Sequence, residues 1–172
     1  MADSDHDDFE QLVPKSKRQG PSLKARAVAM LSRREHSRVE LARKLAPHVD
    51  PEDPTQLDRV LDELQRDNWL SNERFAHNLV HRRASRKGAA LVLQELRQHG
   101  LSDDQLSGIR QQLQSTEVQR ATEVWQKKFG RAPVDAKDYA RQFRFMASRG
   151  FSPQCLRQII GEQESGGSTD ST

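Results

Sequence analysis

An internal repeat with a spacing of 45 to 49 residues constrains the fold of this chain more than any other feature. Three copies of an octet begin at Ala27, Ala76 and Ala121, which lie 49 and 45 residues apart. In each copy the alanine is followed by two variable residues, two apolar residues, one variable residue and two basic residues. Repeats of this length are typical of arrays in which each unit packs only against its neighbours.

A second motif keeps phase with the octet further along each copy. A capping residue, at Asp53, Ser102 and Ser152, is followed by apolar residues four and seven positions later. Asp53 and Ser152 each precede a proline, which predicts helices with proline at the first helical position. Because two independent motifs recur in step, coincidence in an arginine-rich chain is a poor explanation of the repeat.

Further signals predict where other helices begin and end. Ser37 with Glu40, and Ser102 with Gln105, have the spacing of a capping box, in which each side chain satisfies an orphan backbone donor. Glycines at 100 and 150 are each followed by one large apolar residue and then a serine, which indicates a helix end and an immediate reversal. Between the octet and the second motif there is room for one more helix per copy, at residues 37–46, 88–99 and 135–149.

Strand signals are nearly absent, since the chain has no sustained apolar/polar alternation and no Asn-Gly or Asp-Gly turn. The expected fold class is therefore all-α: three tandem three-helix repeats forming an elongated, curved right-handed array with no sheet. With 34% apolar and 31% charged residues, a thin array is easier to build than a spherical core. The expected units are residues 22–68, 69–114 and 115–162, between disordered tails at 1–21 and 163–172.

Composition also limits the compartment. Cys155 is the single cysteine, which excludes an intrachain disulfide and a cysteine-rich zinc site. The first ten residues carry five acidic and no basic side chains, unlike a secretory leader, and the longest apolar run is Ala89 to Leu93. We expect a cytoplasmic chain with no membrane span.

The distribution of charge points to a binding surface. Basic blocks at 14–48, 74–100 and 119–161 alternate with acidic blocks. Such blocks favour contact with nucleic acid or an acidic protein, although a solvated helix face is the alternative. The candidate partner-binding and nucleic-acid-binding residues are Arg33, Arg34, Arg38, Lys44, Arg82, Arg83, Arg86, Lys87, Lys127, Lys128, Arg131, Arg141 and Arg144.

Signals for catalysis, metals and cofactors are weak. His77 and His81 have the spacing of a two-histidine zinc motif, but position 78 is asparagine and no third ligand is evident. Cys155 is expected in the core, as are Trp125 and Phe151, although aromatic side chains such as Trp69 could also stack on bases. With no phosphate loop or nucleophile elbow, we expect neither an enzyme nor a bound cofactor or metal.

Several short motifs, in this order, resemble the bacterial regulatory RecX family, whose members modulate the RecA recombinase. The resembling segments are Ser37-Arg38-Val39-Glu40-Leu41, Trp69-Leu70, Phe75-Ala76, Glu95-Leu96, Gly100-Leu101 and Arg149-Gly150-Phe151. The match covers residues 23–161. The chain departs from the family where Leu70 is followed by Ser71-Asn72 instead of acidic residues.

The resemblance implies an elongated array of three three-helix repeats that binds in the groove of the RecA nucleoprotein filament and inhibits its ATPase and strand exchange. A monomer is expected, in contact with the filament, and single-stranded DNA is a second candidate partner. Two alternatives stay open from the residues alone. One is a sequence-independent single-stranded nucleic-acid binder, and the other is a helical-repeat adaptor for proteins. Binding to nucleic acid predicts strong salt dependence, whereas a purely protein adaptor predicts little.

Overall fold

The structure, a computed structural model, describes residues 20–161 of the chain. The expected tails lie outside this range, apart from residues 20 and 21. Within it the chain forms nine α-helices and one 3₁₀ turn, with no strand. The elements are α1 (Leu23–Leu31), α2 (Arg38–Leu45), η1 (Ala46–His48), α3 (Gln56–Arg66), α4 (Asn72–Arg83), α5 (Ala89–Gln98), α6 (Asp103–Ser115), α7 (Glu117–Lys128), α8 (Ala136–Ser148) and α9 (Pro153–Ile160).

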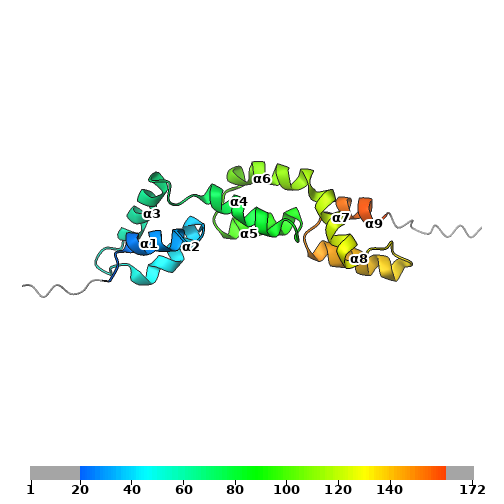
Figure 1. The fold of residues 1–172 in the computed structure, drawn as a ribbon, viewed down its shortest axis with the longest axis horizontal. Coiled ribbons are helices and arrows are strands. Elements are labelled where there is room, and N and C mark those ends of the chain that lie inside the picture. Colours follow the sequence, from blue (N-terminus) through cyan, green and yellow to red (C-terminus); the bar gives the residue numbers. More distant parts are fainter. Residues whose placement is uncertain (1–19, 162–172) are drawn as a thin grey trace, which may run out of the picture.

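The helices form three groups of three along an elongated, arched molecule (Figure 1). Helices α1 to α3 lie at one end, α4 to α6 in the middle and α7 to α9 at the other end. The third helices, α3, α6 and α9, lie along the upper side of this view, and the middle helices lie below them. The prediction of an all-α array of three three-helix units is confirmed.

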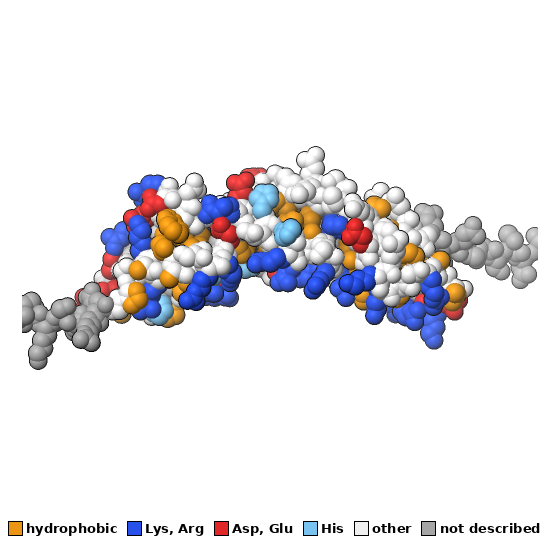
Figure 2. Space-filling model, viewed as in Figure 1, with side chains coloured by type: hydrophobic (Ala, Val, Ile, Leu, Met, Phe, Trp, Pro, Cys, Tyr) orange, Lys and Arg blue, Asp and Glu red, His pale blue; other side chains and the backbone are white. Residues whose placement is uncertain are grey.

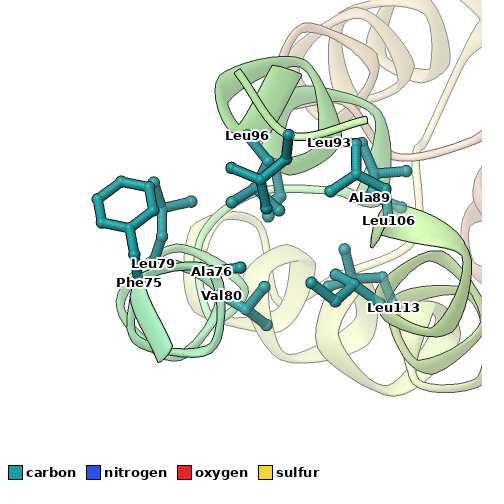
Figure 3. Packing of buried hydrophobic residues seen from close by; sticks show 12 residues of the cluster. Phe75, Ala76, Leu79, Val80, Ala89, Leu93, Leu96, Leu106 and Leu113 are labelled. Carbon is teal, nitrogen blue, oxygen red and sulfur yellow. The ribbon is translucent and has the colours of Figure 1, made fainter. Parts of the chain in front are cut away.

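Each group has its own small hydrophobic core. The first core gathers leucines of α1, α2 and α3, and Leu70 from the connection to α4 also packs into it. In the central unit, apolar side chains of α4, α5 and α6 meet between the three helices (Figure 3). The third core is built around Met146, Phe151 and Leu156. Burying one such large apolar side chain contributes about 1.5–3 kcal/mol, so each unit is stabilised by few residues and depends on its neighbours.

Most local signals act as predicted. Ser102 and Gln105 form a complete capping box at the start of α6, and Ser152 caps α9 with Pro153 in the first turn. Gly100 and Gly150 have φ values of 82° and 85°. This left-handed conformation ends α5 and α8 and turns the chain into the next helix at little steric cost for glycine.

The predicted start of α3 at Asp53-Pro54 is wrong. The chain makes a turn there, in which the Gln56 amide donates to the Asp53 carbonyl oxygen at 3.1 Å, and α3 begins at Gln56. The Asp53 carboxylate accepts a hydrogen bond from the Thr55 hydroxyl at 2.8 Å and pairs with Arg59. Because both carboxylate oxygens are engaged in this turn, Asp53 does not cap the helix.

The predicted capping box at Ser37 is only half formed. The Ser37 hydroxyl accepts from the Glu40 amide at 3.1 Å and caps α2 as expected. The Glu40 side chain, however, turns away from the cap and pairs with Arg34 and Lys44. Ion pairing therefore displaces the second bond of the box.

The contacts between the first and central units form the first seam. The Arg38 amide donates to the Asn72 side chain at 2.9 Å, and Ser37 Oγ lies 3.2 Å from His99 Nδ1. A Cβ atom on Gly100 would lie 2.5 Å from a methyl carbon of Val39. The start of α2 therefore lies directly against the glycine turn between α5 and α6.

The contacts between the central and third units form the second seam, which repeats this arrangement more tightly. The Gly88 amide donates to the Arg149 carbonyl oxygen at 2.8 Å, and a Cβ on Gly88 would lie 2.0 Å from the Gly150 oxygen. The start of α5 thus lies against the glycine turn between α8 and α9. Both seams join equivalent parts of neighbouring units. The third unit is therefore placed on the second in the same way as the second is placed on the first.

Candidate basic interface

The three basic pairs of the octets occupy related places in the fold. Arg82 and Arg83 are the last two residues of α4, and the lysine pair at 127–128 ends α7. The first pair, at 33–34, comes just after α1, which ends at Leu31. Positive charge at a helix C-terminus interacts favourably with the helix dipole. The helices end at or before these pairs. The basic residues that follow them in the sequence therefore do not share a helix face with them, and the repulsion between like charges four residues apart is avoided.

Lysine and arginine side chains form a row along the lower, inner edge of the arch (Figure 2). The row runs below all three units, on the side away from the third helices. An array that repeats by one step presents positive charge at intervals, which suits a partner that also repeats.

Seven of the thirteen candidate residues pair with carboxylates of the chain itself. Five carboxylates organise these pairs: Glu40, Asp58 and Asp62 of α3, Glu95 and Asp138. The pairs are Arg34 and Lys44 with Glu40, Arg38 with Asp58 and Asp62, Arg83 and Lys87 with Glu95, and Arg131 and Arg141 with Asp138. Arg38 joins α2 to α3 and Arg83 joins α4 to α5, whereas Lys44 and Arg141 pair within their own helices. These side chains therefore have structural partners as well as carrying charge.

The other six candidates make no ion pair with any carboxylate within residues 20–161. We call them the unpaired cations: Arg33, Arg82, Arg86, Lys127, Lys128 and Arg144. All six are exposed, and Lys128 also lies 5.5 Å from the centre of the Phe145 ring. An external anion can engage them without breaking an internal pair, so they are the strongest candidates for binding.

Glu40 shows how firmly a paired site is held. The residue is 8% exposed, with the Lys44 ammonium 3.6 Å from one carboxylate oxygen. Burial alone would raise the pKa of this carboxyl, but the hydrogen bond from Arg34 and the nearby charges of His36, Arg34 and Lys44 outweigh burial and lower the pKa to about 2.

We expect this pair to make the first unit sensitive to acid. A carboxyl with a lowered pKa stabilises the fold above its ordinary pKa of 4.5, and this stability is lost as the pH falls from there to about 2. The contribution is on the order of 3 kcal/mol. Unfolding by denaturant between pH 7 and pH 2 measures it. Glu40→Gln should be less stable than wild type at pH 7, and its stability should change less below pH 5. Parallel curves for the two proteins would contradict the assignment.

Arg120 is an arginine that the sequence did not single out. Its guanidinium donates to the carbonyl oxygens of Ala84 at 2.9 Å, Lys87 at 2.8 Å and Leu113 at 2.7 Å. It therefore joins α7 to the turn after α4 and crosses the second seam. Charge patterning could not have separated this structural arginine from the exposed ones, because its partners are backbone atoms more than thirty residues away in two of the three bonds.

Known proteins with similar sequences identify the family of this array. Regulatory protein RecX of Ralstonia nicotianae is 54% identical over 143 residues, which are 83% of this chain and 89% of that protein. Regulatory protein RecX of Leptothrix cholodnii is 49% identical over 81% of this chain and 87% of that protein. The chain belongs to the RecX family. The patterns of the second and third three-helix domains of RecX match residues 71–107 and 115–160.

Solved RecX structures have the same fold. A crystal structure of RecX from Lactobacillus salivarius superposes with a TM-score of 0.65 at 20% identity, covering 80% of this chain and 92% of that one. Another crystal structure of regulatory protein RecX gives a TM-score of 0.62 at 21% identity, covering 81% of this chain and 74% of that one. The shared fold is the helical array.

The three side chains expected in the core, Cys155, Phe151 and Trp125, lie in or against the third core. Cys155 is 3% exposed, and burial, with the nearby Glu117 charge, raises the pKa of its thiol to about 11, so a reactive thiolate is not favoured. Phe151 is 3% exposed, and Trp125 packs on the third core while donating to Gln142 at 2.7 Å. The core assignments are confirmed. Trp69 differs, because it is 46% exposed.

Between residues 20 and 161, no three histidine, cysteine or acidic side chains gather as a metal site would need. Among these residues, no helix has the length and apolar character needed to cross a bilayer.

Proposed function

We propose that this protein binds the RecA nucleoprotein filament and inhibits its ATPase and strand-exchange activities, and so regulates homologous recombination and DNA repair. Membership of the RecX family supports the regulatory role. The observation that carries the mode of binding is the set of unpaired cations on an array that repeats by one step. We further propose that the protein acts as a non-catalytic monomer in the cytoplasm.

The chemistry of the unpaired cations suits a nucleoprotein filament. Neutralising phosphates releases condensed counterions, which makes binding favourable and dependent on salt. None of the six has to leave an internal carboxylate of the described chain before it can meet a phosphate. Basic positions that recur from unit to unit can meet a filament whose phosphates and subunits also recur.

A direct binder of free single strands is the second candidate. The same unpaired cations favour it, because phosphate contact carries no sequence information. A protein adaptor is supported by the exposed apolar side chains Trp69 and Val134, which are 46% and 75% exposed. Binding to the filament requires the recombinase, whereas binding to free single strands does not.

The experiment that separates them measures RecA ATPase inhibition alongside binding to a free oligonucleotide. We expect inhibition at protein concentrations at which a labelled free single strand stays unbound. Inhibition should also weaken strongly between about 50 and 200 mM salt, because several phosphate contacts are screened together. Inhibition that appears only once the free strand is bound would instead support sequestration of DNA. Inhibition that does not change with salt would support the adaptor.

A further inference from the structure

The central unit carries a groove that the basic interface does not use. It lies between α4 and α6 and has a volume of about 420 Å³. Its floor is apolar and includes Ala76, Leu101 and Ile109. Figure 2 shows apolar atoms and histidine side chains in the upper half of the central region, away from the row of lysine and arginine along the lower edge.

Gly108 opens this groove and has no role in folding that the structure shows. It lies inside α6, where glycine is destabilising relative to alanine. A Cβ atom at this position would meet nothing within 4 Å, so close packing does not require glycine. The glycine therefore creates space on the surface instead of relieving a contact inside the protein.

The other two repeats confirm that the fold accepts a large side chain at this place. Gly108 is six residues after the capping position Ser102. The residues six positions after Asp53 and Ser152 are Arg59 and Gln158. The absence of a side chain is thus particular to the central unit.

The charge of the groove indicates what it can bind. The lining residues include Glu73, whose side chain is 85% exposed, and His77, but no lysine or arginine. A phosphate would be repelled by Glu73, whereas a basic side chain would be attracted. The shallow apolar floor suits one aliphatic side chain of a partner in the manner of an anchor residue.

We propose that this groove docks a protein segment that presents an aliphatic side chain next to a lysine or arginine. The inference rests on the proposed function and assigns the segment to the protein subunits of the filament, while the unpaired cations meet its DNA. The two partners of one nucleoprotein filament then bind separate surfaces of the central unit, because no lysine or arginine lines the groove. The exposed backbone of Gly108 allows the partner's main chain to approach α6 closely.

Gly108→Gln tests this proposal, because glutamine already occupies the equivalent position in the third unit. We expect this variant to bind a RecA filament assembled on single-stranded DNA about tenfold more weakly than wild type. Its affinity for the free oligonucleotide should be unchanged. Ser107→Gln is the matched control, since it adds the same side chain to the neighbouring exposed position of α6, which does not line the groove. This control should bind both probes like wild type.

Glu73→Lys tests the charge of the groove independently and should also weaken binding to the filament more than binding to the free strand. Filament binding by Gly108→Gln equal to wild type would overturn the groove proposal and leave the proposed function intact. An equal loss of affinity for the filament and for the free strand would also overturn it, because the groove would then contact DNA instead of protein. If wild type itself fails to bind the filament, both the proposed function and this inference are wrong.

Discussion

Replacing Gly88 by alanine is expected to lower the free energy of unfolding by about 3 kcal/mol, because overpacking at a tight contact costs on the order of 1–3 kcal/mol or more. The added Cβ would lie 2.0 Å from the Gly150 oxygen and 2.3 Å from the Phe151 nitrogen, and these are backbone atoms that no side-chain rotation can move away. Relieving the clash also disturbs the hydrogen bond from Gly88 to Arg149. Gly88 has a φ of −70°, so alanine suffers no backbone strain there and the effect is steric.

Gly108→Ala is the matched control, with the opposite sign expected. Its Cβ enters open space inside a helix, so stability should rise by about 0.5–1 kcal/mol. Denaturant unfolding of both variants, followed by circular dichroism, measures the two changes. Because Gly88 lies at the second seam, its substitution should release the third unit before the first, which amide hydrogen exchange would show as lost protection in α8 and α9. A Gly88→Ala protein as stable as wild type would contradict the close approach of Gly88 to the Gly150 backbone.

Reversing the charge of Arg82 and Arg86 together is expected to weaken binding to the RecA filament on the order of tenfold or more at low salt. Both belong to the unpaired cations of the central unit, so no internal ion pair is lost. Each phosphate contact that disappears should reduce the slope of log affinity against log salt by about 1, so the double variant should lose about 2. Arg83 and Lys87 are left unchanged, because they pair with Glu95 at 3.0 and 3.2 Å and lower the pKa of that partly buried carboxyl against the opposing effect of burial.

Reversal of Arg66 and Arg157 provides a control of equal net charge. Both are exposed, make no ion pair within residues 20–161, and belong to α3 and α9, the helices along the upper side of Figure 1. This variant should keep most of its affinity and of its ATPase inhibition. Equal losses in the two variants would show that net charge alone governs binding. No loss in either would show that the unpaired cations of the central unit are only solvated, and the binding surface would then have to be sought elsewhere.

Much of the local structure followed from the sequence. Ser102, Gln105 and Gly100 act through atoms within five residues of themselves, so their spacing alone predicted where α5 ends and α6 begins. The octet predicted the register of the first helices for the same reason, because helical periodicity is a local property. Asp53 shows the limit of such reasoning: Thr55 and Arg59 compete for the same carboxylate, and motif spacing does not rank competing partners.

The sequence by itself determined that this chain is a repeated all-helical array with basic residues at the ends of its first helices. Only the tertiary structure decided which of those residues are held by carboxylates and which are unpaired. It also decided that Arg120 joins two units and that the backbone of Gly88 lies against the backbone of Gly150. The physical reason is distance along the chain, because helices form from contacts between residues three or four positions apart. Ion pairs, seams and the groove beside Gly108 join residues up to about sixty positions apart, and their geometry exists only once the units have packed.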